Sequence, residues 1–213
     1  MKYKAVIFDL DGTLLDTLDD LGAAVNHALG LKGFPRHSRE EFSGMVGHGV
    51  RRLVRLALPS ERQEDEAFVD ECLADFMSYY TENIDVHTKP YPGMHSLLRT
   101  LQERGVALAV ASNKFQSGTE RLVSTIFPDI RFTAVMGNAE GRPLKPDPEI
   151  VNEVLRLSGK KRSETVMVGD SRTDMLTAAN GGIDSIAVSW GYRRLEGFTI
   201  AETASELLHL LSQ

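Results

Sequence analysis

Apolar residues follow two different patterns along this chain. Short unbroken apolar runs predict buried strands, and apolar residues that recur every three or four positions predict helices. The predicted strands cover 5–8, 106–111, 132–136, 165–169 and 185–188, and the predicted helices among them cover 92–104, 116–126, 148–157, 173–180 and 202–211. Fully apolar strands that alternate with helices indicate a parallel sheet that is covered on both faces.

The stretch from residue 16 to residue 87 shows only the helical pattern. Its predicted helices cover about 16–30, 38–46, 50–58 and 64–81, with Gly30 as the C-cap of the first. Ser38 and Glu41 form a capping-box pattern that opens the second helix. We therefore predict an α/β core made of residues 1–15 and 88–213, interrupted by an inserted all-helical domain over residues 16–87.

Composition and charge narrow the class of protein. Of the 213 residues, 42% are hydrophobic and 25% are charged, which is typical of a soluble globular protein. The formal net charge of −6 argues against nucleic acid as a partner, because neutralising phosphates needs a basic surface. A single cysteine, Cys72, excludes an internal disulfide and suits a reducing compartment. Without a signal-peptide pattern or a membrane-spanning apolar run, we expect a soluble, cytoplasmic protein.

Two aspartates, Asp9 and Asp11, follow the first predicted strand directly. In extended backbone, residues two positions apart project to the same side, so both carboxylates could meet at one point. Two carboxylates that are forced together repel each other unless they share a proton or a cation. The alternative is that they are only the polar end of a strand, with Gly12 forming a turn.

Other polar residues follow the later strands or precede the next helix. They are Ser112, Asn113 and Lys114, then Lys145, and finally Asp170 and Asp174. Ligands of open parallel sheets bind beyond the carboxyl ends of the strands, so we expect these side chains to gather at one edge with Asp9 and Asp11.

The residue types at this edge indicate a particular chemistry. Carboxylate and carbonyl oxygens suit Mg²⁺, and the lack of clustered Cys and His argues against zinc. Ser112 and Lys145 could bind the oxygens of a phosphoryl group. One aspartate could then attack phosphorus while a second protonates the leaving oxygen and later activates water.

In their order and spacing, these motifs resemble those of the haloacid dehalogenase-like hydrolase superfamily over essentially the whole chain. The matching stretches are Asp9-Leu-Asp11-Gly-Thr13, Ser112-Asn113, Lys145-Pro-Asp-Pro and Gly169-Asp170-Ser171-x-x-Asp174. The resemblance implies a Rossmann-like parallel sheet whose helical insertion is a mobile cap that closes over the substrate. It also implies a Mg²⁺-dependent hydrolase that acts on a small phosphorylated metabolite.

The same resemblance implies a role for each matching residue. Asp9 would be the nucleophile that forms an aspartyl-phosphate, and Asp11 the general acid and base. The metal would be held by Asp9, by the main-chain carbonyl of Asp11 and by the carboxylate of Asp170. Asp174 would support the site indirectly and pair with Lys145, although the dipole of the following helix is an alternative reason for its position.

Ser112 and Lys145 would hold the phosphoryl group, with Thr13 and Asn113 also expected to bind substrate. In the insertion, His48 lies between two glycines and Arg51 follows shortly after. Both could face an anionic substrate, or they could form a loop tip beside a solvated basic helix face.

Further stretches resemble the phosphoglycolate phosphatase branch of the superfamily. They are Leu14-Leu15-Asp16-Thr17, Gly47-His48-Gly49, Tyr91-Pro92-Gly93, Ser112-Asn113-Lys114 and Trp190-Gly191-Tyr192. Many relatives carry an acidic residue shortly after the strand that precedes the lysine motif, whereas here the stretch from Met136 reads Met-Gly-Asn-Ala-Glu-Gly-Arg-Pro. This departure concerns the substrate more than the chemistry, because Lys145 is present.

Other functions remain alternatives to a phosphatase. A phosphosugar mutase of the β-phosphoglucomutase kind uses the same nucleophile but returns the phosphoryl group to the sugar. A phosphoacceptor switch domain shares the carboxylates and the Lys, but it needs no helical insertion. A dehalogenase would need neither Asp11 nor a metal, and a binding protein would need neither Asp11 nor Lys145. We expect a monomer or a weak homodimer.

Overall fold

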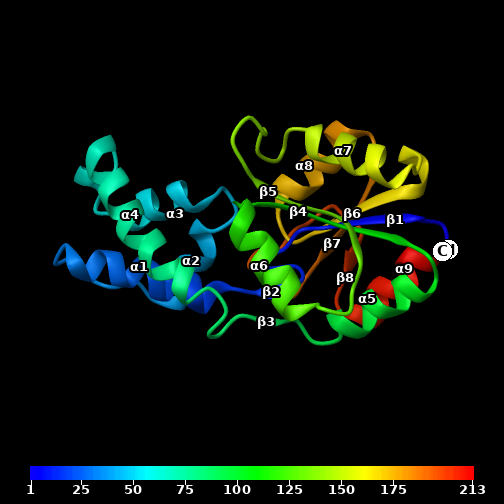
Figure 1. The fold of residues 1–213 in the computed structure, drawn as a ribbon, viewed down its shortest axis with the longest axis horizontal. Coiled ribbons are helices and arrows are strands. Elements are labelled where there is room, and N and C mark those ends of the chain that lie inside the picture. The colour runs from blue at the N-terminus through cyan, green and yellow to red at the C-terminus, as the bar shows by residue number, and fades with distance from the viewer. The chain divides into compact units, whose positions relative to one another are not determined.

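The structure, a computed structural model, describes residues 1–213 and divides into two compact units (Figure 1). One unit comprises Met1–Asp16 and Pro90–Gln213, and the other comprises Thr17–Lys89. The predicted insertion, 16–87, and the helical unit therefore begin one residue apart and end two residues apart. No helix of the structure combines the length and the apolar character needed to cross a membrane.

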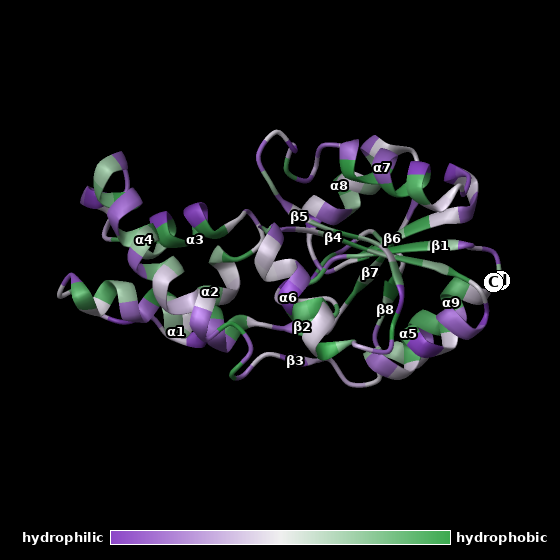
Figure 2. Cartoon of the chain, in the orientation of Figure 1, coloured by the Kyte–Doolittle hydropathy of each residue, from purple (hydrophilic) through white to green (hydrophobic).

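A parallel six-stranded sheet forms the centre of the larger unit, as predicted, in the order β5-β4-β1-β6-β7-β8. Its strands are β1 (Ala5–Phe8), β4 (Ala107–Phe115), β5 (Phe132–Asn138), β6 (Thr165–Gly169), β7 (Asp184–Val188) and β8 (Ile200–Ala201). β1 lies in the middle, between β4 and β6, and all four of its residues are buried. The inner strands consist of the apolar runs (Figure 2). Apolar side chains on both faces of a strand are expected where both faces are covered.

Helices cover both faces of this sheet, with α7 and α8 on one side and α5 and α9 on the other (Figure 1). The helices of this unit are α5 (Met94–Glu103), α6 (Gln116–Ile126), α7 (Glu149–Ser158), α8 (Arg172–Gly181) and α9 (Ala204–Ser212), with the short 3₁₀ helix η2 (Arg162–Glu164). Beneath α7 and α8, the in-register residues Ile7, Ala109 and Met167 share one core cluster with Val151 and Ala178. The doubly covered α/β architecture is thus confirmed.

The smaller unit is built from α1 (Leu18–Leu31), α2 (Arg39–Met45), α3 (Val50–Ala57), the 3₁₀ helix η1 (Ser60–Arg62) and α4 (Glu66–Glu82). The predicted capping box is confirmed, because Ser38 Oγ accepts the Glu41 N–H and Glu41 accepts the Ser38 N–H. The predicted Gly30 C-cap is wrong. The first helix continues through Gly30 to Leu31, and it is Gly33 that adopts the left-handed conformation, with φ of 73°.

The strands differ from the predictions mainly in two ways, besides shifts of one or two residues at the ends of β5 and β7. β4 continues to Phe115, four residues past its predicted end, so Ser112 lies within the strand and not after it. Its polar end stays extended because Phe115 still pairs with Asn138 of β5. The two-residue strands β2 (Leu15–Asp16), β3 (Lys89–Pro90) and β8 were not predicted, because two residues are too few to show a pattern.

The helical unit contains one buried carboxylate, Asp20 of α1, which ties down the segment after α4. It accepts hydrogen bonds from the main-chain N–H groups of His87 and Thr88 and from the Thr88 hydroxyl, at 2.8–2.9 Å. Its exposed fraction is only 2%. Without the carboxylate these part-buried main-chain donors would have no acceptor in the protein, so we expect Asp20 to stabilise the helical unit.

We predict that Asp20→Ala lowers the free energy of unfolding by about 2–4 kcal/mol, because several donors lose their acceptor at once. Asp20→Asn should lose less, since one acceptor oxygen remains. Asp19→Ala is the matched control: Asp19 pairs with Arg39 in an exposed ion pair, which is typically worth less than about 1 kcal/mol. Urea denaturation followed by circular dichroism measures all three, and equal losses at positions 19 and 20 would contradict the prediction.

Candidate active site

The polar residues that the sequence placed after the strands lie at the carboxyl edge of the sheet. Asp9 follows β1 directly and Asp170 follows β6 directly, and these two strands are neighbours. β4 borders β1 on its other side and brings Ser112 to the same edge. Parallel strands end on one side of a sheet, so residues more than a hundred positions apart in the chain become neighbours.

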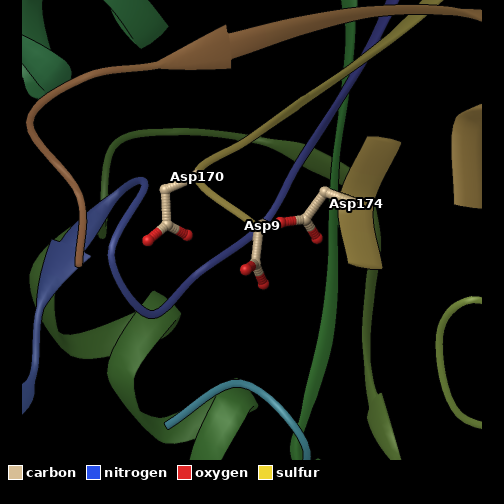
Figure 3. A group of neighbouring side chains, drawn as sticks. All are labelled: Asp9, Asp170 and Asp174. Atoms are coloured by element: carbon tan, nitrogen blue, oxygen red, sulfur yellow. The ribbon is translucent and has the colours of Figure 1, made fainter. Parts of the chain in front are cut away.

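Three carboxylates meet at this edge, and Figure 3 shows them side by side. Asp9, Asp170 and Asp174 each offer an oxygen, and these oxygens all lie within 4.8 Å of one another. All three residues are buried. Buried carboxylates this close repel each other strongly unless cations compensate them.

Lys145 is the first of these compensating cations. Its Nζ lies 2.8 Å from Asp9 Oδ1 and 2.6 Å from Asp174 Oδ1, and its side chain is 2% exposed. The main chain of Lys145 is held by Asn113, whose Oδ1 accepts the Lys145 N–H at 2.8 Å and whose Nδ2 donates to the Lys145 carbonyl at 3.2 Å. The Asn113 amide, expected to bind substrate, thus fixes the lysine loop.

Both oxygens of the Asp174 carboxylate have partners within the protein. Oδ1 accepts from Lys145, and Oδ2 accepts the Ser171 N–H at 3.0 Å and the Ser171 hydroxyl at 2.6 Å. Asp174 also completes a capping box at the start of α8. The two alternatives for this residue, a partner for Lys145 and a helix-terminus residue, therefore hold together.

The turn after β1 contacts the Asp170 carboxylate through Gly12 and Thr13. Gly12 has φ of 87°, and a Cβ atom there would lie 2.5 Å from Asp170 Oδ2, so only glycine fits. The Thr13 hydroxyl, which was expected to contact substrate, is fully buried and donates to Asp170 Oδ1 at 3.4 Å. The geometry gives Thr13 a supporting place behind the carboxylate.

The loop after β7 borders the site. Its residues were not among those predicted for the site. The Tyr192 N–H donates to Asp170 Oδ2 at 2.8 Å, and the Trp190 indole donates to the Thr13 carbonyl at 3.1 Å. A Cβ at Gly191 would lie 2.2 Å from the Asp170 Cβ. In the sequence this loop is marked by a glycine between two aromatic residues shortly after a strand, and the stretch was named only for its resemblance to the phosphoglycolate phosphatase branch.

Asp11 and Ser112 lie beside a second buried lysine, Lys114, which was expected at this edge but was given no role there. Lys114 Nζ is 3.3 Å from Asp11 Oδ1, and the Lys114 N–H donates to Ser112 Oγ at 3.2 Å. The Lys114 side chain is 1% exposed, whereas that of Asp11 is 13% exposed. Of this trio, Asp11 is therefore the most open to solvent.

Burial and mutual repulsion shift the ionisation of these groups. Burial raises the pKa of Asp9 well above its ordinary value, and the charge of Asp174 raises it further. Burial, and then the charge of Asp174, raises the pKa of Asp170 to about 7. Burial alone would lower the pKa of Lys145, but the charges of Asp174 and Asp9 outweigh it and leave that pKa above its ordinary value.

The donor set fits a hard divalent cation. Six charged side chains are paired or clustered at this edge, four aspartates and two lysines: Asp9, Asp11, Asp170, Asp174, Lys114 and Lys145. When all are ionised, two negative charges remain uncompensated, which equals the charge of one Mg²⁺. Carboxylate oxygens are the ligands that Mg²⁺ takes in proteins, and the site contains no Cys or His sulfur or nitrogen ligands.

The two residues predicted to bind substrate from the insertion lie in the helical unit. His48 is exposed and precedes Gly49, the N-cap of α3. Arg51 of α3 pairs with Glu66 and Asp70 of α4. The Arg51 guanidinium therefore already has two carboxylate partners within its own unit.

Comparison with known proteins agrees with this fold. The family model described as haloacid dehalogenase-like hydrolase matches residues 6–188, which include every motif at the sheet edge. The chain belongs to this family.

Relatives with assigned names narrow the class of hydrolase. A phosphoglycolate phosphatase of Mesorhizobium japonicum is 35% identical over 193 residues, covering 90% of this chain and 85% of the relative. Phosphoglycolate phosphatase 1 of Pseudomonas aeruginosa is 34% identical over 212 residues, covering 96% of this chain and 75% of the relative. The chain is accordingly a phosphoric monoester hydrolase, a phosphatase of the haloacid dehalogenase-like type.

Solved structures share the whole architecture. A crystal structure from Lactobacillus delbrueckii subsp. bulgaricus, provisionally named a phosphoglycolate phosphatase, has a TM-score of 0.91 and 33% identity, covering 99% of both chains. CbbY from Rhodobacter sphaeroides, crystallised with phosphate, has a TM-score of 0.72 at 22% identity, covering 96% of both chains, and shares the fold.

The raised pKa of Asp170 leads to a prediction about the metal-free protein. Because its folded pKa of about 7 exceeds the unfolded value of 3.8, the folded state binds more protons between these pH values. Stability should therefore fall as pH rises through this window and then level off. Asp170→Asn removes the carboxylate charge, so its stability should fall less.

Urea midpoints in a chelating buffer at about pH 5 and about pH 8 test this, because the upper part of the window, from pH 5 to about 7, lies between the two values. We expect Asp170→Asn to be more stable than the unchanged protein at the higher pH, by about 1–3 kcal/mol, and to differ less at the lower pH. Parallel pH dependence of the two proteins would contradict the prediction.

Proposed function

We propose that this phosphatase is Mg²⁺-dependent and hydrolyses a small phosphate monoester through an aspartyl-phosphate on Asp9. The arrangement of the Asp9 carboxylate carries the proposal. Oδ1 accepts the Leu10 N–H at 2.7 Å and pairs with Lys145 at 2.8 Å, whereas Oδ2 has no hydrogen-bond donor from the protein. One oxygen is thus anchored and the other is available to attack phosphorus.

In the first step, Asp9 Oδ2 would form a bond to phosphorus as the bond from phosphorus to the ester oxygen breaks. The carboxyl group of Asp11 would give its proton to the departing oxygen, which leaves as an alcohol. Lys145 and Ser112 would bind the oxygens of the phosphoryl group during transfer. The position of the Lys145 ammonium supports this role, because it lies against Asp9, the attacking residue.

In the second step, water would attack the phosphorus of the aspartyl-phosphate. Asp11, now a carboxylate, would take a proton from the water, and the bond from phosphorus to Asp9 would break. The products are inorganic phosphate and the original Asp9 carboxylate, with Asp11 protonated for the next cycle. One residue would serve both steps because the proton that it loses first is regained second.

Asp9, Asp170 and the main-chain carbonyl of Asp11 would hold the Mg²⁺. When bound, the ion would screen the negative charges that the nucleophile and the substrate phosphate bring together. Asp170 is supported in this role by the Tyr192 N–H and the Thr13 hydroxyl, which hold its carboxylate. Asp174 would act indirectly, because both of its oxygens already accept hydrogen bonds.

We further propose that the helical unit, Thr17–Lys89, is the cap that selects the substrate. The chemical groups that the mechanism uses all belong to the α/β unit, which leaves recognition of the rest of the substrate to other residues. His48 and Arg51 stay candidates for that recognition. Phosphoglycolate is the first substrate to test, because the relatives at 34–35% identity are named phosphoglycolate phosphatases.

We also propose that the protein works in a reducing cytoplasm, which suits its single, buried cysteine, Cys72.

Asp9→Asn should abolish turnover, with a loss of at least about a thousandfold in kcat, because an amide is not a nucleophile toward phosphorus. The matched control is Asp184→Asn, at the start of β7 and hence at the opposite end of the sheet. It should keep nearly full activity. Phosphate release in the presence of Mg²⁺ measures both, and turnover by Asp9→Asn near that of the control would contradict the mechanism.

Phosphoglycolate should be hydrolysed with a higher kcat/KM than phosphorylated sugars of similar charge, and chelation should remove the activity until Mg²⁺ is restored. A panel of phosphate monoesters with chromatographic analysis of products measures this preference. Release of inorganic phosphate in equal amount to the alcohol supports hydrolysis. An isomeric sugar phosphate without free phosphate would indicate a mutase instead.

A further inference from the structure

Lys114 is a buried cation at the reaction edge for which the proposed mechanism has no use. Its side chain is 1% exposed, so its ammonium has almost no contact with solvent. Removing an ammonium from water costs several kcal/mol, which only a close negative partner can offset. The residue therefore needs an explanation beyond surface charge.

The main chain of Lys114 is fixed on both sides. Its N–H donates to Ser112 Oγ at 3.2 Å, and its carbonyl accepts the Thr119 hydroxyl at 3.3 Å. A Cβ on Gly137 of the neighbouring strand β5 would lie 2.6 Å from the same carbonyl, so the packing here is close. The ammonium is thus presented from a rigid part of β4.

The ammonium of Lys114 lies 3.3 Å from Asp11 Oδ1. Asp11 belongs to the turn after β1, and rotation about two side-chain bonds sets the direction of its carboxylate. Lys145, the other buried lysine, pairs with Asp9 and Asp174. Each lysine therefore contacts a different carboxylate of the proposed mechanism. Lys145 contacts the nucleophile, Asp9, and Lys114 contacts the acid, Asp11.

From this geometry we propose that Lys114 is a positioning residue that holds the carboxyl group of Asp11 where it can protonate the leaving oxygen. The proposal rests on the proposed role of Asp11 as the acid. Because kcat/KM reports the first step and not the later attack of water, a misplaced acid should lower kcat/KM only for those esters whose leaving oxygen needs a proton.

Leaving groups of different basicity test this directly. An alkyl phosphate needs a proton on its leaving oxygen, whereas p-nitrophenyl phosphate leaves as a stable anion and needs little help. We expect Lys114→Met to lower kcat/KM for the alkyl ester at least about tenfold more than for the aryl ester. Equal losses for the two esters would overturn the proposal, because they would indicate a structural or phosphate-binding role.

Thr119→Val is the matched control, since it removes the hydroxyl that contacts the Lys114 main chain and keeps the ammonium. Thr119→Val should lower kcat/KM for the alkyl ester and for the aryl ester by the same factor. A larger loss for the alkyl ester would overturn the assignment to the ammonium. If Lys114→Met does not fold, Lys114→Arg decides the question. Arginine keeps the positive charge but moves the N–H donors. We therefore expect Lys114→Arg to lower kcat/KM more for the alkyl ester than for the aryl ester, and equal losses for the two esters would overturn the proposal.

Asp11→Asn separates this inference from the proposed function. If Asp11→Asn shows the same selective loss of the alkyl ester as Lys114→Met, both ideas are supported. If Asp11→Asn is selective and the Lys114 variants are not, only the role of Lys114 is overturned. If Asp11→Asn itself is not selective, the proposed acid role of Asp11 fails, and the inference about Lys114 fails with it.

Discussion

The structure of the α/β unit depends on holding mutually repelling carboxylates together at one edge of its sheet. Asp9, Asp170 and Asp174 are all buried, and oxygens of all three lie within 4.8 Å of one another. Lys145 offsets part of this repulsion by contacting two of the three. Burial and repulsion still raise the pKa of Asp9 and of Asp170, so the protein alone does not fully compensate the charge. That residual negative charge fits the divalent cation that we propose for this edge.

Close approach of main chain to side chain is the second constraint, and glycine meets it. Gly12 and Gly191 both lie against the Asp170 side chain, where any Cβ would overlap it. The loop that contains Gly191 also donates the Tyr192 N–H to Asp170. A turn after β1 and a loop after β7 thus enclose a carboxylate that follows β6. The metal-binding residue that we propose is consequently held by parts of the chain far from it in sequence.

Much of the fold follows from local patterns. The strand 165–169 and the helix after Phe115 are predicted with their observed bounds, because apolar runs and helical spacing are strong signals in buried elements. The polar end of β4 is not predicted, since Ser112 to Lys114 stay extended only through pairing with a neighbouring strand. The two-residue strands likewise depend on pairing between segments and leave no local pattern.

The sequence by itself determined that Asp9, Asp11, Ser112, Lys145 and Asp170 belong to one edge, because parallel strands have to end on the same side. Only the tertiary structure decided the partner of each group. It turned the Asn113 amide to the main chain of Lys145, placed Thr13 behind Asp170 and brought Lys114 to Asp11. Hydrogen bonds and ion pairs form between atoms a few ångströms apart. Their partners therefore depend on packing between distant segments, which no spacing along the chain records.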